Sequence, residues 1–177
     1  MVTARRIGFL GLLALALFGE VAAKEQATVA PPAPTASQEA EVVSIAIDQR
    51  TAQPMLMLRG KRDKRSLVMV IGRWEATSIA LQLDGVTPPR PLTHDLFLTL
   101  FGRLKVTLTR VVITDLRNDI YYAIVYLDAD GSKVTVDSRP SDAIALAIRA
   151  KAPILVEDRV FEKSERSRQR PGKTPYF

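Results

Sequence analysis

Three charged residues, Asp137, Arg139 and Asp142, stand immediately before a wholly apolar run of the sequence. Carboxylate oxygens are ligands that Mg²⁺ and Mn²⁺ prefer, and a guanidinium matches the geometry of a phosphate. Such a group could hold a divalent ion beside a phosphate, as metal-assisted hydrolysis of a phosphodiester requires. We therefore expect Arg139 and Asp142 to be catalytic, Arg139 also to bind phosphate, and Asp137 and Asp142 to bind metal.

A second charged group lies nearer the middle of the chain. Arg90 is in a proline-rich connection, His94 and Asp95 are in the first turn of an expected helix, and Glu75 begins another helix. If the helix N-termini share one side of the domain, Glu75 and Asp95 become metal ligands and Arg90 a phosphate ligand. We expect His94, as general acid or base, and Asp95 to be catalytic. A structural interpretation stays open for each acid, because first-turn acids stabilise helices.

Composition excludes several kinds of chemistry. The chain has no cysteine and one histidine, which excludes disulfides, thiolate zinc sites, cysteine nucleophiles and multi-histidine metal sites. The net charge of +6 is concentrated in a predicted loop and in the C-terminal tail. These clusters could bind nucleic acid or anionic lipid, but charged loop tips are more often simply solvated. Their basic residues are Arg59, Lys61, Arg62, Lys64 and Arg65 in the loop, and Arg159, Lys163, Arg166, Arg168, Arg170 and Lys173 in the tail.

The first part of the chain predicts export. Residues 1–23 resemble a secretory signal, with a basic start, an apolar segment and small residues before the expected cleavage site. The apolar segment has about 12 residues, fewer than the roughly 20 that span a bilayer, so we expect no stable membrane span after cleavage. Residues 24–41 are rich in alanine and proline and are expected to form a linker. The protein is therefore expected in the periplasm or outside the cell.

The rest of the chain predicts one compact α+β domain over residues 42–163. Apolar alternation predicts strands over 43–48, 55–58, 67–71, 106–113, 120–127, 134–136 and 154–156. Helices are expected over 75–83 and 93–101, and a third begins near Pro140 and is apolar all round, so it should be buried on every side. The order strand, strand, strand, helix occurs twice, which suggests two related halves with a mixed or antiparallel sheet. Residues 164–177 are expected to form a disordered basic tail.

These motifs resemble the bifunctional nuclease family, or BFN domain. The matching segments are IGRWEA (71–76), LDGV (83–86), PRPLTHDL (89–96), VVI (111–113), YYA (121–123) and DSRPSDAIALA (137–147). The resemblance covers about residues 42–161. It implies a compact α+β domain that cleaves both DNA and RNA.

Two functions from different classes follow. The first is an exported nuclease of low sequence specificity, assisted by Mg²⁺ or Mn²⁺ held by carboxylates, with DNA and RNA as substrates. The second is a noncatalytic envelope module, in which the two charged motifs lock the fold or the interface of a homo-oligomer. The two hypotheses differ in what a change at Asp142 or His94 should remove, activity in the first and stability in the second.

Overall fold

The computed structural model describes residues 36–168. The predicted signal sequence, most of the predicted linker and the end of the basic tail lie outside the described residues. Within residues 36–168, no helix is long and apolar enough to cross a membrane.

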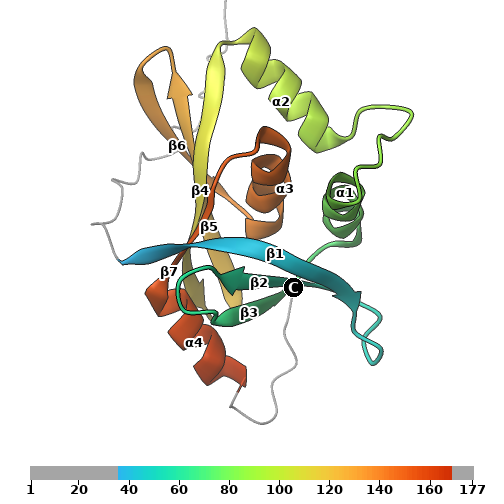
Figure 1. Cartoon of the computed structure of the whole chain (residues 1–177), viewed down its shortest axis with the longest axis vertical. Helices are drawn as coiled ribbons and strands as arrows, with labels where there is room; N and C mark the ends of the chain where they lie inside the picture. Colours follow the sequence, from blue (N-terminus) through green and yellow to red (C-terminus); the bar gives the residue numbers. More distant parts are fainter. Residues whose placement is uncertain (1–35, 169–177) are drawn as a thin grey trace, which may run out of the picture. The chain divides into compact units, whose positions relative to one another are not determined.

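A seven-stranded mixed sheet forms the framework of the domain (Figure 1). The strand order is β3-β2-β1-β7-β4-β5-β6, and every neighbouring pair is antiparallel except β4 and β7, which are parallel. The strands are β1 (Ser37–Ile47), β2 (Pro54–Gly60), β3 (Ser66–Val70), β4 (Val106–Arg117), β5 (Ile120–Ala129), β6 (Ser132–Ser138) and β7 (Ile154–Glu157). Alternating apolar residues explain these strands, since Leu56 and Leu58 of β2 point into the core and are fully buried.

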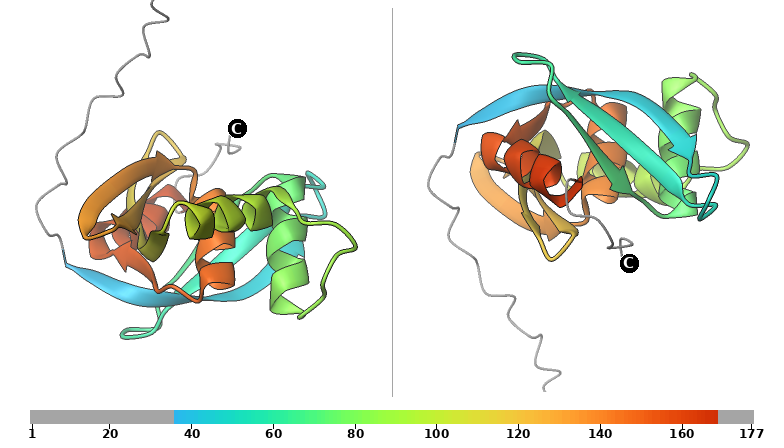
Figure 2. Two further views of the ribbon diagram at one scale, coloured as in Figure 1. Left: turned by 90° about the horizontal axis from the view of Figure 1, so that it is seen from above. Right: turned by 90° about the horizontal axis from the view of Figure 1, so that it is seen from below.

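In the described part of the chain, four helices accompany the sheet: α1 (Arg73–Leu83), α2 (Thr93–Arg103), α3 (Pro140–Ala150) and α4 (Asp158–Arg168). Helix α3 packs against α1, α2, β4 and β5, whereas α4 packs against β3, β4 and β7. The views from above and below show α2 and α4 at opposite ends of the domain (Figure 2). The predicted α+β fold is therefore confirmed, and three of the helices meet on one side.

Helix α3 is the buried helix that its apolar sequence predicts. The five residues from Ala143 to Ala147 are all buried, and Ile144 is fully enclosed. Pro140 occupies the first helical turn, where its missing N–H costs no hydrogen bond, and Lys151 ends the helix in a left-handed conformation with φ of 54°. Because α3 is held on all sides, the residues at its start are placed rigidly.

The order of elements repeats as the sequence suggests, with one addition. Strands β1 to β3 form a meander followed by α1, and β4 to β6 form a second meander that precedes α3. Strand β7 lies between the two meanders and joins them: Ala40 of β1 pairs with Ile154, and Val111 of β4 pairs with the same residue from the other side.

At both ends of the described residues, regular structure extends beyond the predicted limits of the domain. Strand β1 begins at Ser37, inside the segment predicted as linker, because this part of the chain pairs with both β2 and β7 and buries Gln38 and Ala40. The tail predicted as disordered from Ser164 is helical through Arg168. The buried residues of α4 are Val160, Phe161 and Ser164. This largely charged segment is therefore an amphipathic helix with one face in the core.

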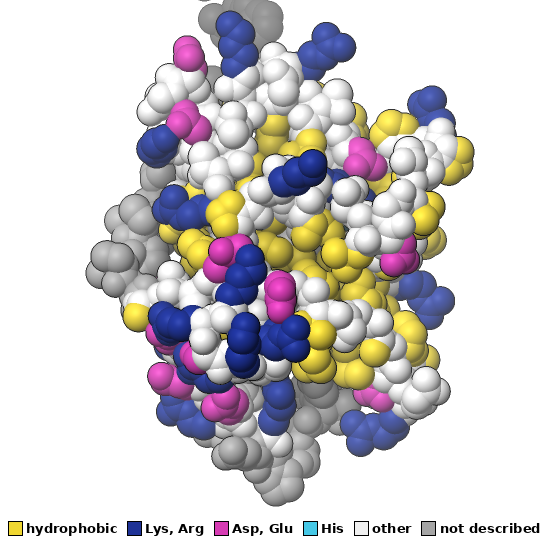
Figure 3. All heavy atoms as spheres, in the orientation of Figure 1, with side chains coloured by type: hydrophobic (Ala, Val, Ile, Leu, Met, Phe, Trp, Pro, Cys, Tyr) yellow, Lys and Arg dark blue, Asp and Glu magenta, His cyan; other side chains and the backbone are white. Residues whose placement is uncertain are grey.

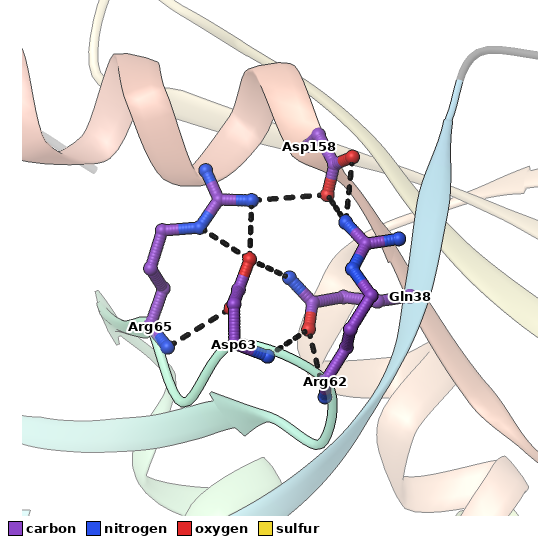
Figure 4. A network of polar contacts seen from close by, with 5 residues as sticks. All are labelled: Gln38, Arg62, Asp63, Arg65 and Asp158. Atoms are coloured by element: carbon purple, nitrogen blue, oxygen red, sulfur yellow. Dashed lines mark hydrogen bonds and ion pairs between the residues drawn. The ribbon is translucent and has the colours of Figure 1, made fainter.

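The basic loop is held by acidic partners (Figure 4). Arg62 donates two hydrogen bonds of 2.8 Å to the carboxylate of Asp158, the first residue of α4, and Arg65 pairs with both Asp158 and Asp63. Gln38 of β1 donates a hydrogen bond to Asp63 and accepts one from the backbone of Arg62. Much of the positive charge of this loop therefore ties β1, the β2–β3 hairpin and α4 together.

Candidate active site

The starts of α1, α2 and α3 surround a cleft with a volume of about 970 Å³. Its floor includes Val125 and Leu127 of β5 and Leu146 of α3, and Val136 of β6 also lines it. In the space-filling view, hydrophobic side chains are visible over the region between the three helices (Figure 3). Charged side chains lie at one end of this largely apolar cleft, where the helices begin.

Arg139 joins two of the helices at the mouth of the cleft. Its Nε donates a hydrogen bond of 2.7 Å to Oδ2 of Asp142, and its Nη2 donates one of 2.5 Å to Oε1 of Glu75. The Arg139 side chain is 65% exposed, whereas Glu75 is 15% exposed. The two acids hold the pKa of Arg139 above its ordinary value, chiefly through the hydrogen bond that Arg139 donates to Asp142. The guanidinium is thus permanently charged and accessible from the cleft.

Asp142 also accepts a hydrogen bond from the only histidine of the chain. Nε2 of His94 lies 3.2 Å from Oδ1 of Asp142, and Nδ1 of His94 lies 2.9 Å from Oγ of Ser78. Burial opposes ionisation of Asp142, but the hydrogen bonds from His94 and Arg139 outweigh it, so the pKa of Asp142 is below its ordinary value. The ionised carboxylate can only accept, so Nε2 carries a proton, and in a neutral ring Nδ1 then accepts from the Ser78 hydroxyl.

This geometry gives His94 a different role from the expected one. The histidine is buried, and both ring nitrogens are occupied by Ser78 and Asp142. It is therefore placed to orient Asp142 rather than to exchange a proton with a bound molecule. The sequence signal for this arrangement is weak, because Ser78 lies within α1 with no motif to mark it.

Asp95 faces away from the cleft. Its Oδ1 accepts a hydrogen bond of 2.7 Å from Nε of Arg149, and its Oδ2 accepts one of 2.8 Å from the backbone N–H of Leu92. Burial would raise the pKa of Asp95, but these two hydrogen bonds lower it overall. Arg149 also donates to the carbonyl of Ser78 at 2.9 Å, so it connects α3 to both α1 and α2. In this arrangement Asp95 acts as a helix cap and a structural ion pair.

The remaining predicted residues are dispersed. Asp137 is exposed and lines the cleft near Arg139, whereas Arg90 is exposed and is not among the residues that line it. The four predicted metal ligands, Glu75, Asp95, Asp137 and Asp142, do not come together as a set. Nowhere in residues 36–168 do three or more histidine or acidic side chains group closely enough to hold a metal ion.

The donors consequently do not fit a preformed site for Mg²⁺ or Mn²⁺. Glu75 and Asp142 are both engaged by Arg139, and Asp95 is engaged by Arg149. A hard divalent cation needs several oxygen ligands at once, and here the cations closest to the carboxylates are guanidinium groups. No step of a reaction is assigned to a metal ion on this geometry.

A family model for the bifunctional nuclease domain matches residues 55–169. The chain belongs to this family, which confirms the resemblance seen in its motifs.

Relatives of two kinds are similar to the chain. An uncharacterized protein of Mycobacterium tuberculosis is 42% identical over 126 residues, which is 71% of this chain and 75% of the relative. Bifunctional nuclease 1 of Oryza sativa subsp. indica is 33% identical over 103 residues, or 55% of this chain and 31% of the rice protein. Bifunctional nuclease 2 of Arabidopsis thaliana is 30% identical over 123 residues, which cover 62% of this chain and 37% of the relative. The match thus spans about a third of each plant protein.

Proposed function

We propose that this domain is a nuclease that hydrolyses phosphodiester bonds of DNA and RNA with low sequence specificity. The observation that carries the proposal is Arg139, an accessible guanidinium at the mouth of a large cleft, held between carboxylates from two other positions. The names of the plant relatives, bifunctional nucleases, agree with it. Sequence specificity is expected to be low because a contact to phosphate carries no information about the base.

The proposed chemistry begins with exchange of partners at Arg139. A phosphodiester takes the place of one carboxylate on the guanidinium, which can bind two phosphate oxygens at once. The carboxylate released, that of Glu75 or Asp142, is then free to accept a proton from a water molecule. That water attacks phosphorus, the ester bond to the leaving oxygen breaks, and the leaving oxygen takes a proton from solvent.

The charge at the mouth constrains this mechanism. Three acids, Glu75, Asp137 and Asp142, line the cleft together with one arginine, so the mouth carries more negative than positive charge when all four are ionised. This excess of negative charge repels a phosphate unless a further cation offsets it. Participation of Mg²⁺ or Mn²⁺ therefore remains part of the proposal, to be decided by measurement with and without each ion.

The same proposal places the activity outside the cytoplasm. It rests on the basic and apolar character of residues 1–23, which resemble a secretory signal. Cell fractionation of a tagged full-length chain tests it: the protein should be recovered from the periplasm or the medium, and recovery in the cytoplasm alone contradicts export.

The decisive experiment compares two arginines. Purified protein is incubated with labelled DNA and RNA in EDTA, Mg²⁺ or Mn²⁺, and cleavage is measured for the wild type, Arg139→Lys and Arg103→Lys. Lysine keeps the charge but not the two-pronged contact, so Arg139→Lys should lower the rate by about 100-fold or more. Arg103 is an exposed arginine at the end of α2 that does not line the cleft, and its variant should match the wild type.

A second function is favoured by one observation, which is that the arginines near the cleft are already paired with carboxylates of the protein itself. Arg139 and Arg149 each bind carboxylates from another helix, as they would in a purely structural motif. In that case the domain is a noncatalytic interaction module, and homo-oligomers are one assembly it could form. Rigorously purified protein that cleaves nothing under any of the three conditions, with a thermal midpoint that Mn²⁺ does not raise, would support this alternative.

A further inference from the structure

Trp74 is conspicuously exposed for its type. It is the only tryptophan of the chain, lies in the first turn of α1 and lines the cleft, and its surface is 80% accessible. Large aromatic side chains are normally well buried, so one left in solvent at a cleft is informative. Its neighbour in sequence is Glu75, which binds Arg139. The indole and the guanidinium therefore line the same cleft, from the starts of α1 and α3.

A second aromatic ring lies on the opposing helix. Phe97 of α2 lines the same cleft, one turn after His94, and 48% of its surface is exposed. Its ring packs edge-to-face against that of Phe101, with centroids 6.3 Å apart and an angle of 62° between the planes. This contact limits the motion of the ring while part of it stays accessible. The cleft thus presents aromatic surface from two helices.

We propose that the aromatic part of the cleft is a nucleobase subsite, in which Trp74 and Phe97 take an unpaired base while Arg139 takes the adjoining phosphate. A nucleotide combines a flat apolar base with an anionic phosphate, and the cleft combines accessible aromatic rings with an accessible guanidinium. Stacking on aromatic side chains tolerates every base, because each base has a π-face. The inference rests on the proposed nuclease function and narrows its substrates to single-stranded DNA and RNA.

Paired nucleic acid does not satisfy this subsite. In a duplex, each base is already stacked and paired, and exposing it requires unstacking that costs a few kcal/mol in general. A single strand offers its bases without that cost. The wild-type protein should therefore cleave a single strand faster than the same sequence in a duplex.

The test uses two strands that carry the same phosphates. One is a hexamer of thymidylate, and the other is a hexamer of abasic residues, so only the bases differ. Binding is followed by the fluorescence of Trp74 and by anisotropy of a label on the strand, in an Asp142→Asn background in which cleavage should be slower by about 100-fold or more. Because Trp74 is the only tryptophan, a change in its emission reports directly on the cleft.

The base-containing strand should quench Trp74 and bind about 5- to 150-fold more tightly than the abasic strand, the range expected for stacking of one base. Trp74→Ala should remove that difference, whereas Trp74→Phe should keep most of it. Leu104→Ala is the matched control, since Leu104 is 69% exposed but does not line the cleft, and it should change nothing. Circular dichroism confirms that each variant is folded.

Three outcomes overturn the proposal, and they can be told apart. If the two strands bind equally and Trp74 is not quenched while the wild type still cleaves, the subsite is wrong and the nuclease function stands. If neither strand binds and the wild type cleaves nothing, the proposed function itself fails and the subsite with it. If the emission of Trp74 shifts with protein concentration in the absence of any strand, the aromatic surface is covered by a second copy of the chain.

Discussion

Asp142→Asn separates the catalytic and structural interpretations of the central motif. Asparagine has nearly the same shape as aspartate and keeps one oxygen, which can still accept from Nε2 of His94. Its amide NH₂ cannot accept the hydrogen bond that Arg139 donates at 2.7 Å. The substitution therefore removes the negative charge and one charge-assisted hydrogen bond while leaving the packing at the start of α3 intact.

The expected loss of stability is small. Hydrogen bonds between charged groups contribute about 1.5–3 kcal/mol, but the Arg139 side chain is 65% exposed and can be rehydrated. Removal of the charge also relieves the cost of burying it at Asp142. A net destabilisation of about 1 kcal/mol is expected, or a lowering of Tm by about 4 °C for a domain of this size.

The expected loss of activity is much larger. If Asp142 accepts the proton of the attacking water, its replacement should lower the cleavage rate by about 10²- to 10⁴-fold. Rates on a labelled single strand and urea unfolding by circular dichroism, measured on the same preparations, give both numbers. A variant that loses stability as expected but cleaves at the wild-type rate would refute the catalytic role and leave Asp142 as a structural residue.

Acid unfolding supplies an independent check on Asp142. Its pKa in the folded protein is below the ordinary value of 3.8, so its contribution to stability is present above about pH 3.8 and is lost as the pH falls through the lower folded pKa. The difference in unfolding free energy between the wild type and Asp142→Asn should therefore be constant near neutral pH and shrink in acid. A difference that grows as the pH falls would contradict the assignment.

Three further predictions concern the surroundings of the site. Arg149→Met should destabilise the domain by about 3 kcal/mol in urea unfolding, because its side chain is 5% exposed and its loss leaves Asp95 unpaired; in a double-mutant cycle with Asp95→Asn the two effects should not add. In ¹⁵N spectra, the imidazole of His94 should carry its proton on Nε2 when it is neutral, and the opposite tautomer would contradict the orienting role. Ser78→Ala should lower the free energy of unfolding by about 1–3 kcal/mol, because it leaves Nδ1 of His94 without a donor. Phe161→Ala should cost about 3–5 kcal/mol in thermal or urea unfolding, since Phe161 is fully buried, and a negligible effect would mean that α4 adds little to the core.

Much of the fold could be read from local patterns. The apolar run after Pro140 predicts a helix buried on every side, and α3 is that helix. The alternation of apolar and polar residues that predicts strands such as β2 and β5 is also a local pattern. The beginning of β1 and the whole of α4 were missed because their residues are mostly polar. Gln38 is buried and donates a hydrogen bond to Asp63, which lies far from it in the sequence. The few apolar residues of α4 pack against strands of the folded sheet.

The site was predicted in part for a similar reason. Residue types and spacing indicated that Glu75, His94, Arg139 and Asp142 belong together, and the first turns of three helices do bring them to one cleft. Which atoms meet depends on how the helices pack. Asp95 is only one residue from His94, yet it points toward Arg149 instead of the cleft. A rotation of 100° per residue along a helix decides this, and the sequence does not say which face turns inward.

The late position of β7 in the chain has a consequence for folding. Among residues 36–168, only this strand links the two meanders, and its partners in β1 lie more than a hundred residues earlier, with Ser37 opposite Glu157. During synthesis, which starts at the N-terminus, each meander can form from residues that are close in the sequence. The sheet becomes continuous only when β7 has been added. Contacts between distant residues slow the final step of folding. Until residues 154–157 are available, the edges of β1 and β4 that face each other across this gap stay open to pairing with other chains.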